Sequence, residues 1–170
     1  MKIAVCFVVC STVLLGSAFA QPFRSQISLG YGTSFGGYGV TYEYNFNKVL
    51  ALQVGAGFYP QSTYPSSVIA LKTYVLRADK GNPFVPFAEI EFGTLGQFTT
   101  QYLNFAGPNS TVSTEYTTEY GPSFLFGMEV YLLGRYFGVM GALGTSYDFA
   151  PSTTNHKISL AYDVGITIGL

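Results

Sequence analysis

The residues that could support hydrolytic chemistry lie near the carboxyl end of the chain. The sequence contains a single histidine, His156, and its neighbours of catalytic type are Asp148, Ser152 and Ser159. A Ser–His site needs both side chains within hydrogen-bond reach of each other. In an extended chain His156 and Ser159 fall on opposite faces, so they do not converge without a bulge. We therefore predict a solvated loop histidine and no catalytic residues.

Other binding chemistries find no matching pattern. The two cysteines, Cys6 and Cys10, lie within the first ten residues, outside the domain that we expect to fold. That domain has one histidine and no cysteine to bind zinc, so we expect no zinc cluster. The glycines between positions 30 and 37 are not followed by a helical pattern, as those of a phosphate-binding loop would be. Eight Lys and Arg residues stand against nine Asp and Glu residues without a basic cluster, which excludes a nucleic-acid binder. We predict no cofactor and no metal.

The composition indicates an outer surface that is not in water. Only 10% of the residues are charged, whereas a soluble domain carries about 25%. Hydrophobic residues make up 48% of the chain and aromatic residues 17%, which is far too much for a disordered coil.

The first twenty residues predict a cleavable signal peptide. Lys2 precedes an apolar run from Ile3 to Leu15, and Ala18 and Ala20 flank Phe19 as in an A-x-A cleavage site. The run is shorter than the roughly 20 residues of a membrane-spanning helix. A lipoprotein modified at Cys10 is the alternative. We expect one domain, residues 21–170, to follow the signal peptide at residues 1–20.

From residue 21 onward the hydrophobic pattern has a period of two, which indicates β-strands. It is clearest at the carboxyl end, where one face carries Ile158, Leu160, Tyr162, Val164, Ile166, Ile168 and Leu170. The same pattern predicts seven more strands, at residues 23–32, 37–45, 49–59, 67–77, 83–95, 123–133 and 136–147. Strands of about ten residues have the length that crosses a bilayer at a tilt.

The predicted links alternate in length. Short links follow the second, fourth and sixth strands, and most of the others are longer, as in an outer-membrane barrel. The longest predicted loop runs from Gly96 to Pro122 and is rich in Thr, Ser, Asn and Tyr. A loop of this length is uncommon unless it is functional or mobile. We expect either a contact surface for an extracellular macromolecule or a tolerated mobile insertion, with a rigid paired hairpin as the rival.

On this architecture the chain resembles the small eight-stranded OmpA/OmpX-type barrels of Gram-negative outer membranes. The resemblance implies an all-β fold, an eight-stranded antiparallel up-and-down transmembrane barrel, exported through the periplasm. The last strand resembles the signal that the outer-membrane assembly machinery reads, carried here by Tyr162, Val164, Ile166, Ile168 and Leu170. Members of this superfamily often end in Phe or Trp, whereas this chain ends in Leu170.

The polar strand faces decide which side of the barrel meets lipid. They consist largely of Gly, Ser, Ala and Thr, whereas a surface in water would be about 25–35% charged. Small residues suit the narrow interior of an eight-stranded barrel, which leaves no general diffusion pore. Aromatic residues at strand ends are typical of interfacial girdles: Phe23, Tyr31, Tyr44, Phe58, Phe84, Phe124, Phe137 and Tyr147. We therefore expect outer-membrane lipid outside.

The alternation directs eight charged residues inward: Arg24, Glu43, Lys72, Glu89, Glu91, Glu129, Lys157 and Asp163. The parity of the link between the fourth and fifth strands predicts a register with Lys72 opposite Glu89. We expect these two residues to form an ion pair inside the barrel. The interior charges are interpreted as a plug of salt bridges, with a gated polar path or cation site as the alternative.

The sequence therefore predicts a non-enzymatic outer-membrane barrel with a structural or surface-recognition role through its exposed loops. Two alternatives are an outer-membrane lipid-modifying enzyme that uses His156 and a secreted soluble barrel that binds a small apolar ligand.

Overall fold

The computed structural model describes residues 25–60, 64–75, 83–104, 111–132, 136–149 and 158–170, with the backbone alone over 97–104 and 111–117. No helix among these residues is long and apolar enough to cross a membrane. The predicted signal peptide at residues 1–20 lies outside the described residues.

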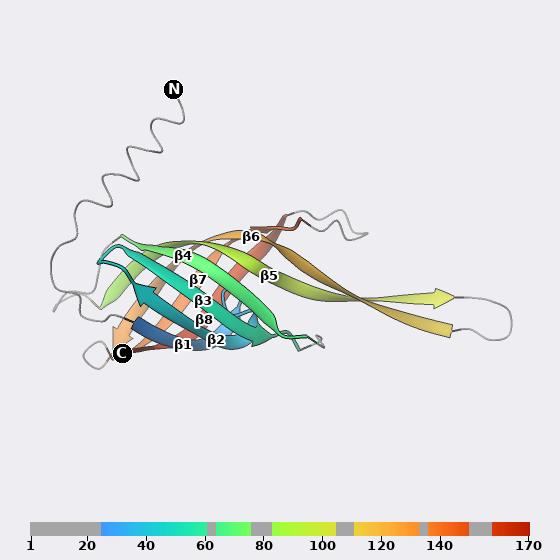
Figure 1. The fold of residues 1–170 in the computed structure, drawn as a ribbon, viewed down its shortest axis with the longest axis horizontal. Coiled ribbons are helices and arrows are strands. Elements are labelled where there is room, and N and C mark those ends of the chain that lie inside the picture. Colours follow the sequence, from blue (N-terminus) through green and yellow to red (C-terminus); the bar gives the residue numbers. More distant parts are fainter. Residues whose placement is uncertain (1–24, 61–63, 76–82, 105–110, 133–135, 150–157) are drawn as a thin grey trace, which may run out of the picture.

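Eight antiparallel strands form a closed barrel in which each strand pairs with the next and β8 pairs with β1 (Figure 1). The strands are β1 Ser25–Gly32, β2 Gly37–Asn45, β3 Leu50–Phe58, β4 Ser66–Tyr74, β5 Phe84–Asn104, β6 Thr111–Leu132, β7 Phe137–Tyr147 and β8 Ile158–Gly169. The predicted all-β, eight-stranded antiparallel barrel is confirmed. Closure pairs both edges of every strand within the wall, so no open sheet edge is left there.

The assignment of inward and outward faces is correct in all eight strands. On β2, for example, Tyr42 and Tyr44 are exposed while Thr41 and Glu43 are buried. On β8 the apolar residues are exposed, with Val164 at 58%, and Asp163 and Thr167 are buried. The period of two fixes the faces because successive side chains point to opposite sides of a strand.

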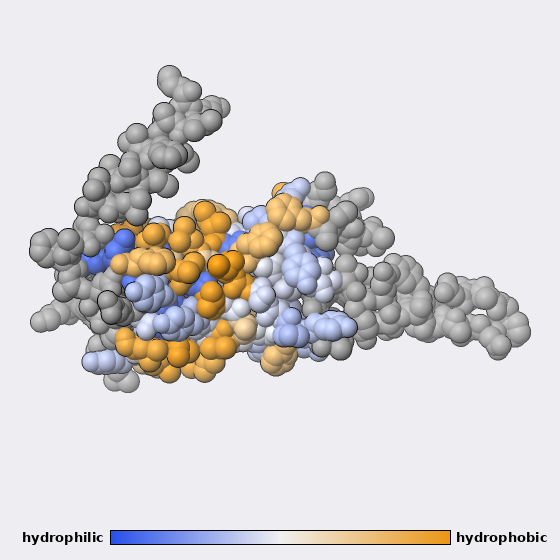
Figure 2. All heavy atoms as spheres, viewed as in Figure 1, coloured by the Kyte–Doolittle hydropathy of each residue, from blue (hydrophilic) through white to orange (hydrophobic). Residues whose placement is uncertain are grey.

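The outer wall is apolar. Hydrophobic side chains cover much of the barrel surface in view in Figure 2, and large ones on every strand are exposed. Aromatic residues form contacts across strands near the ends of the wall, as in the row Tyr31, Tyr38 and Phe58, with ring centroids 4.5 and 6.2 Å apart. In water such a continuous apolar surface would drive association.

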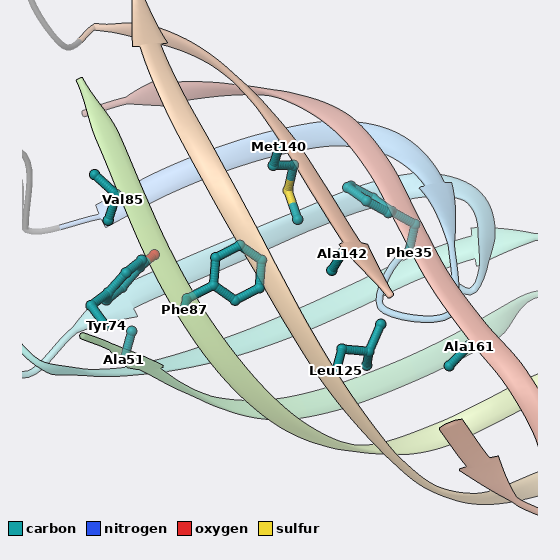
Figure 3. Close-up of a cluster of buried hydrophobic side chains, with 9 residues drawn as sticks. All are labelled: Phe35, Ala51, Tyr74, Val85, Phe87, Leu125, Met140, Ala142 and Ala161. Atoms are coloured by element: carbon teal, nitrogen blue, oxygen red, sulfur yellow. The ribbon is translucent and has the colours of Figure 1, made fainter. Parts of the chain in front are cut away.

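The barrel interior contains an apolar cluster beside its charged residues. The cluster consists of Phe35, Ala51, Tyr74, Val85, Phe87, Leu125, Met140, Ala142 and Ala161, all directed into the barrel (Figure 3). Side chains from several strands thus meet in the lumen, as expected for eight strands.

The predicted loop from Gly96 to Pro122 is wrong in its boundaries. β5 and β6 continue as a paired two-stranded hairpin up to Asn104 and Thr111, and this hairpin projects far beyond the other strands at the end of the barrel opposite Leu170 (Figure 1). A register shift between Thr94 and Gly96 marks the bulge where the hairpin leaves the barrel. The apolar period does not report these strands because a two-stranded ribbon that projects beyond the wall has no core face that must be apolar.

Candidate functional site

Six of the predicted interior charges lie within the described residues, and all six are buried. Glu43, Lys72, Glu89, Glu91, Glu129 and Asp163 are each at most 3% exposed. Arg24 and Lys157 lie outside the described residues. These six predicted residues are five carboxylates and one amine, and two further carboxylates, Glu119 and Asp148, are also buried.

Lys72 is the centre of a buried network near the end of the barrel that holds Leu170. Its Nζ lies 3.3 Å from Glu43 Oε2 and forms a second ion pair with Glu129. The Tyr74 hydroxyl lies 2.6 Å from Glu43 Oε1 and 3.2 Å from Glu129 Oε1, and Gln26 Nε2 donates to Glu43 at 3.0 Å. The ammonium also lies over the Phe87 ring, 4.0 Å from its centroid. Charged, hydrogen-bonding and aromatic groups thus meet in the lumen at this level.

The predicted ion pair of Lys72 with Glu89 is wrong, although the predicted register is correct. The two residues are Cα partners in the β4–β5 ladder, but Lys72 Nζ pairs with Glu43 of β2 and Glu129 of β6 instead. Glu89 Oε1 accepts hydrogen bonds from Ser34 Oγ at 3.3 Å and Gln53 Nε2 at 3.2 Å. In so narrow a barrel a long side chain reaches across the lumen, so register alone does not select its partner.

The turn between β1 and β2, from Thr33 to Gly36, folds into the lumen. Ser34 and Phe35 are completely buried, and Phe35 belongs to the interior cluster (Figure 3). Ser34 binds Asp163 twice, through its backbone N–H at 3.0 Å and its hydroxyl at 2.5 Å. Gly36 and Gly37 have φ of 63° and 91°, which favours glycine at these two positions. The β1–β2 turn therefore acts as a plug.

Five inward glycines form the hollow that receives this plug: Gly30, Gly39, Gly55, Gly57 and Gly165. A Cβ at any of them would approach an atom of Ser34 or Phe35 more closely than 3.0 Å. The sequence pattern indicates only a link between two strands at this turn, because its four residues carry no strand pattern. The signal that could have revealed the plug is this concentration of glycine on the inward faces of β1, β2, β3 and β8.

Several buried oxygens in or beside the plug make no hydrogen bond of regular geometry. They are Oε2 of Glu89, both carboxylate oxygens of Glu91, and the hydroxyls of Thr33, Thr41 and Ser123. All of them can accept hydrogen bonds. Around Glu91 the side chains of Ser34, Thr33 and Ser123 lie close enough to share hydrogen bonds with its carboxylate.

The hydrolytic candidates do not come together as a site within the described residues. His156 and Ser152 lie outside them, Asp148 is 7% exposed, and the Ser159 hydroxyl lies 2.6 Å from that of Ser146. Among the described residues no three His, Cys, Asp or Glu side chains are grouped as metal ligands.

The five residues of the predicted assembly signal all point outward. Tyr162, Val164, Ile166, Ile168 and Leu170 are between 39% and 59% exposed. They form one continuous row along the outer face of β8 and the residue that follows it, and β8 closes the barrel by pairing with β1.

A solved structure has a fold similar to that of this chain. Among solved structures, the chain is similar to the crystal structure of the N-terminal β-barrel domain of Pseudomonas aeruginosa OprF. The TM-score is 0.51 and the sequence identity 15%, over 88% of this chain and 100% of that chain. The two share a fold. The resemblance to eight-stranded OmpA-type barrels is confirmed at this level. No family model and no curated protein matches the chain.

Proposed function

We propose that this chain is an integral protein of a bacterial outer membrane, with a closed interior and a surface-recognition role for the β5–β6 hairpin. The observation that supports this location is the distribution of polarity: apolar side chains lie on the outer wall and charged side chains lie inside, the reverse of a water-soluble protein. Leu29, Ile69 and Ile90 are at least 50% exposed on the outer wall, while Glu89 and Glu129 are buried inside. A water-soluble carrier would have the opposite arrangement. In a closed barrel the backbone N–H and C=O groups of every strand form hydrogen bonds with neighbouring strands, which is required where the surrounding hydrocarbon offers no hydrogen-bond partner.

Placing a charge on the outer wall tests this location. We expect Ile166→Lys to impair assembly strongly, because an outward Lys near mid-bilayer costs about 2–4 kcal/mol. Ser159→Lys, near the end of the same strand, is the matched control and should assemble nearly as well as the native chain. The measurement is the amount of heat-modifiable protein in the outer-membrane fraction. Equal yields for the two variants, or a soluble native protein, would contradict the location.

The hairpin supports the recognition role because it leaves the wall with both edges unpaired. The last pair of β4 with β5 is Val68–Gly93, and the pairing of β6 with β7 begins at Ser123. Beyond these points the strand ladder joins β5 and β6 only to each other, and the wall reaches them through two further bonds, from Phe149 N–H to the Tyr120 carbonyl and from the Tyr59 hydroxyl to the Thr94 carbonyl. The segments 97–104 and 111–120 contain no Lys and no Pro, the residues that commonly protect strand edges. An exposed edge of this kind can bind an extended segment of a partner protein.

Removing the hairpin tests its role separately from the fold. The variant joins Gly96 to Glu119, which are paired neighbours, through an Asn-Gly turn in place of residues 97–118. We expect this trimmed barrel to remain heat-modifiable and inserted, since the deleted residues pair only with each other. In nanodiscs it should lose the binding to extracellular proteins that the full chain shows on an array. Undiminished binding would contradict a role for the hairpin, and misfolding would show that the hairpin is part of the barrel wall.

A further inference from the structure

An open groove crosses the outer wall of the barrel over three adjacent strands, β6, β7 and β8. Its volume is about 560 Å³. Two outward rows of residues border it: Phe126, Leu143 and Tyr162 on one side, and Met128, Gly141 and Val164 on the other. The members of each row are Cα partners in the β6–β7 and β7–β8 ladders, so the groove runs across the strands.

The groove exists because the second row has no side chain at its middle position, Gly141. A Cβ there would meet no atom closer than the Asp163 carbonyl oxygen, 3.9 Å away, so the space outside Gly141 is open. At the inward Gly144 of the same strand, by contrast, a Cβ would approach the Phe124 carbonyl oxygen to 1.9 Å. Packing within the barrel therefore does not require glycine at position 141. A glycine inside a strand often marks a place where another molecule approaches the backbone closely.

The border of the groove is apolar except at Tyr162. Phe126 and Leu143 are each more than half exposed, so they stand out from the wall beside the open space. The ring of Tyr162 lies 5.9 Å from that of Tyr31, which places it next to the aromatic row of Tyr31, Tyr38 and Phe58. Tyrosines in such rows lie at the headgroup level of a membrane. One end of the groove therefore reaches the headgroup level, and the rest lies in the apolar wall.

We propose that this groove binds one acyl chain of a membrane phospholipid, with the headgroup beside Tyr162. The proposal rests on the location of the outer wall in lipid that is proposed above. Lipid tails are as apolar as leucine, so burial from water provides no driving force here and the gain comes from van der Waals contacts. A chain in the groove touches the backbone floor and both bordering rows, whereas a chain elsewhere on the convex wall is in contact on one side only.

A second copy of the barrel fits the groove less well than an acyl chain. The outer walls of two barrels are both convex, so a second wall would place at most a single side chain beside Gly141. A flexible chain can follow the groove across all three strands, between Phe126 and Met128 on β6 and between Tyr162 and Val164 on β8.

The test counts the phospholipid that stays with the barrel. The full barrel is folded in vesicles of phosphatidylethanolamine and phosphatidylglycerol, extracted into mild detergent and measured by native mass spectrometry. We expect one retained phospholipid per native chain. Gly141→Leu should lose it, because the new side chain occupies the groove, and this variant should fold because the position is open. Ala56→Leu, the matched control, enlarges an outward residue of β3 and should retain the phospholipid.

A second pair of variants serves if Gly141→Leu fails to give the heat-modifiable form. Leu143→Ala lowers one border of the groove and should reduce the retained phospholipid, whereas Leu71→Ala removes the same side chain from the outer face of β4 and should not. A phosphatidylethanolamine with a photoreactive diazirine in one acyl chain maps the position. After irradiation in the same vesicles, it should label the peptides that contain Phe126 and Leu143 more strongly than the peptide that contains Leu71.

The outcomes separate this proposal from the location of the wall. An inserted barrel that retains no phospholipid, or equal retention within both pairs of variants, would overturn the acyl-chain site and leave the location intact. A dimer that Gly141→Leu abolishes would also overturn it, because a second copy would then occupy the groove. A native barrel that stays soluble without detergent would instead contradict the location itself.

Discussion

Replacing Lys72 with Met is expected to lower the free energy of unfolding by about 3–5 kcal/mol, because it leaves buried carboxylates without their counter-charge. Glu43 and Glu129, the two ion-pair partners of Lys72, are at most 3% exposed, so solvent cannot take over the role of the ammonium. Urea unfolding of the barrel in lipid vesicles, followed by gel mobility, measures the change.

Double-mutant cycles distinguish the observed partners from the one that register predicts. Glu129→Gln combined with Lys72→Met should recover part of the lost stability, since neutral replacement of a buried pair is often tolerated. Glu89→Gln combined with Lys72→Met should show much weaker coupling. Stronger coupling to Glu89 than to Glu129 would contradict the network, as would native stability of Lys72→Met alone.

Removing the aromatic ring of the plug should have an effect of similar size. We expect Phe35→Ala to cost about 3–5 kcal/mol of stability, the usual range for a fully buried Phe in a packed cluster. The ring is completely buried and rests over Gly30 and Gly165. The same urea titration measures the loss. A loss below about 1 kcal/mol would show that the turn is not packed in the lumen.

Two valine substitutions at adjacent residues of β3, one inward and one outward, test whether the turn lies in the hollow. Gly55→Val places a side chain where the Ser34 carbonyl lies, so we expect displacement of the turn and a clear loss of stability. Ala56→Val adds a similar side chain to the adjacent residue on the outer wall and should be nearly neutral. Equal effects of the two substitutions would contradict the inward position of the turn.

The fold was predictable from the sequence because one physical signal repeats in every strand of the wall. Alternation of apolar and polar residues determined the faces of all eight strands, and the parity of the β4–β5 link placed Lys72 opposite Glu89, as observed. The limits of β2, Gly37–Asn45, are those predicted. These features depend on nearest neighbours along the chain or across one turn.

The contents of the lumen were less predictable because they depend on contacts across the barrel. The partners of Lys72 come from β2 and β6, strands that are not neighbours of β4. The inward path of Ser34 and Phe35 depends on glycines in four strands, which a scan for strand periodicity treats as neutral. The extent of the hairpin was missed for another reason: outside the wall no apolar face is required, so the period disappears while backbone pairing continues.

The central claim is that the outer wall of the barrel lies in lipid, and a tryptophan introduced on that wall tests it most directly. The native chain contains no Trp, so a single substitution gives an unambiguous fluorescence signal. Leu71, 45% exposed on the outer face of β4, is the reporter position, and Tyr116 on the hairpin is the control. In vesicles of lipids brominated along their acyl chains, we expect strong quenching of Leu71→Trp and little quenching of Tyr116→Trp. Fluorescence of Leu71→Trp that the brominated lipid leaves unchanged would contradict the account.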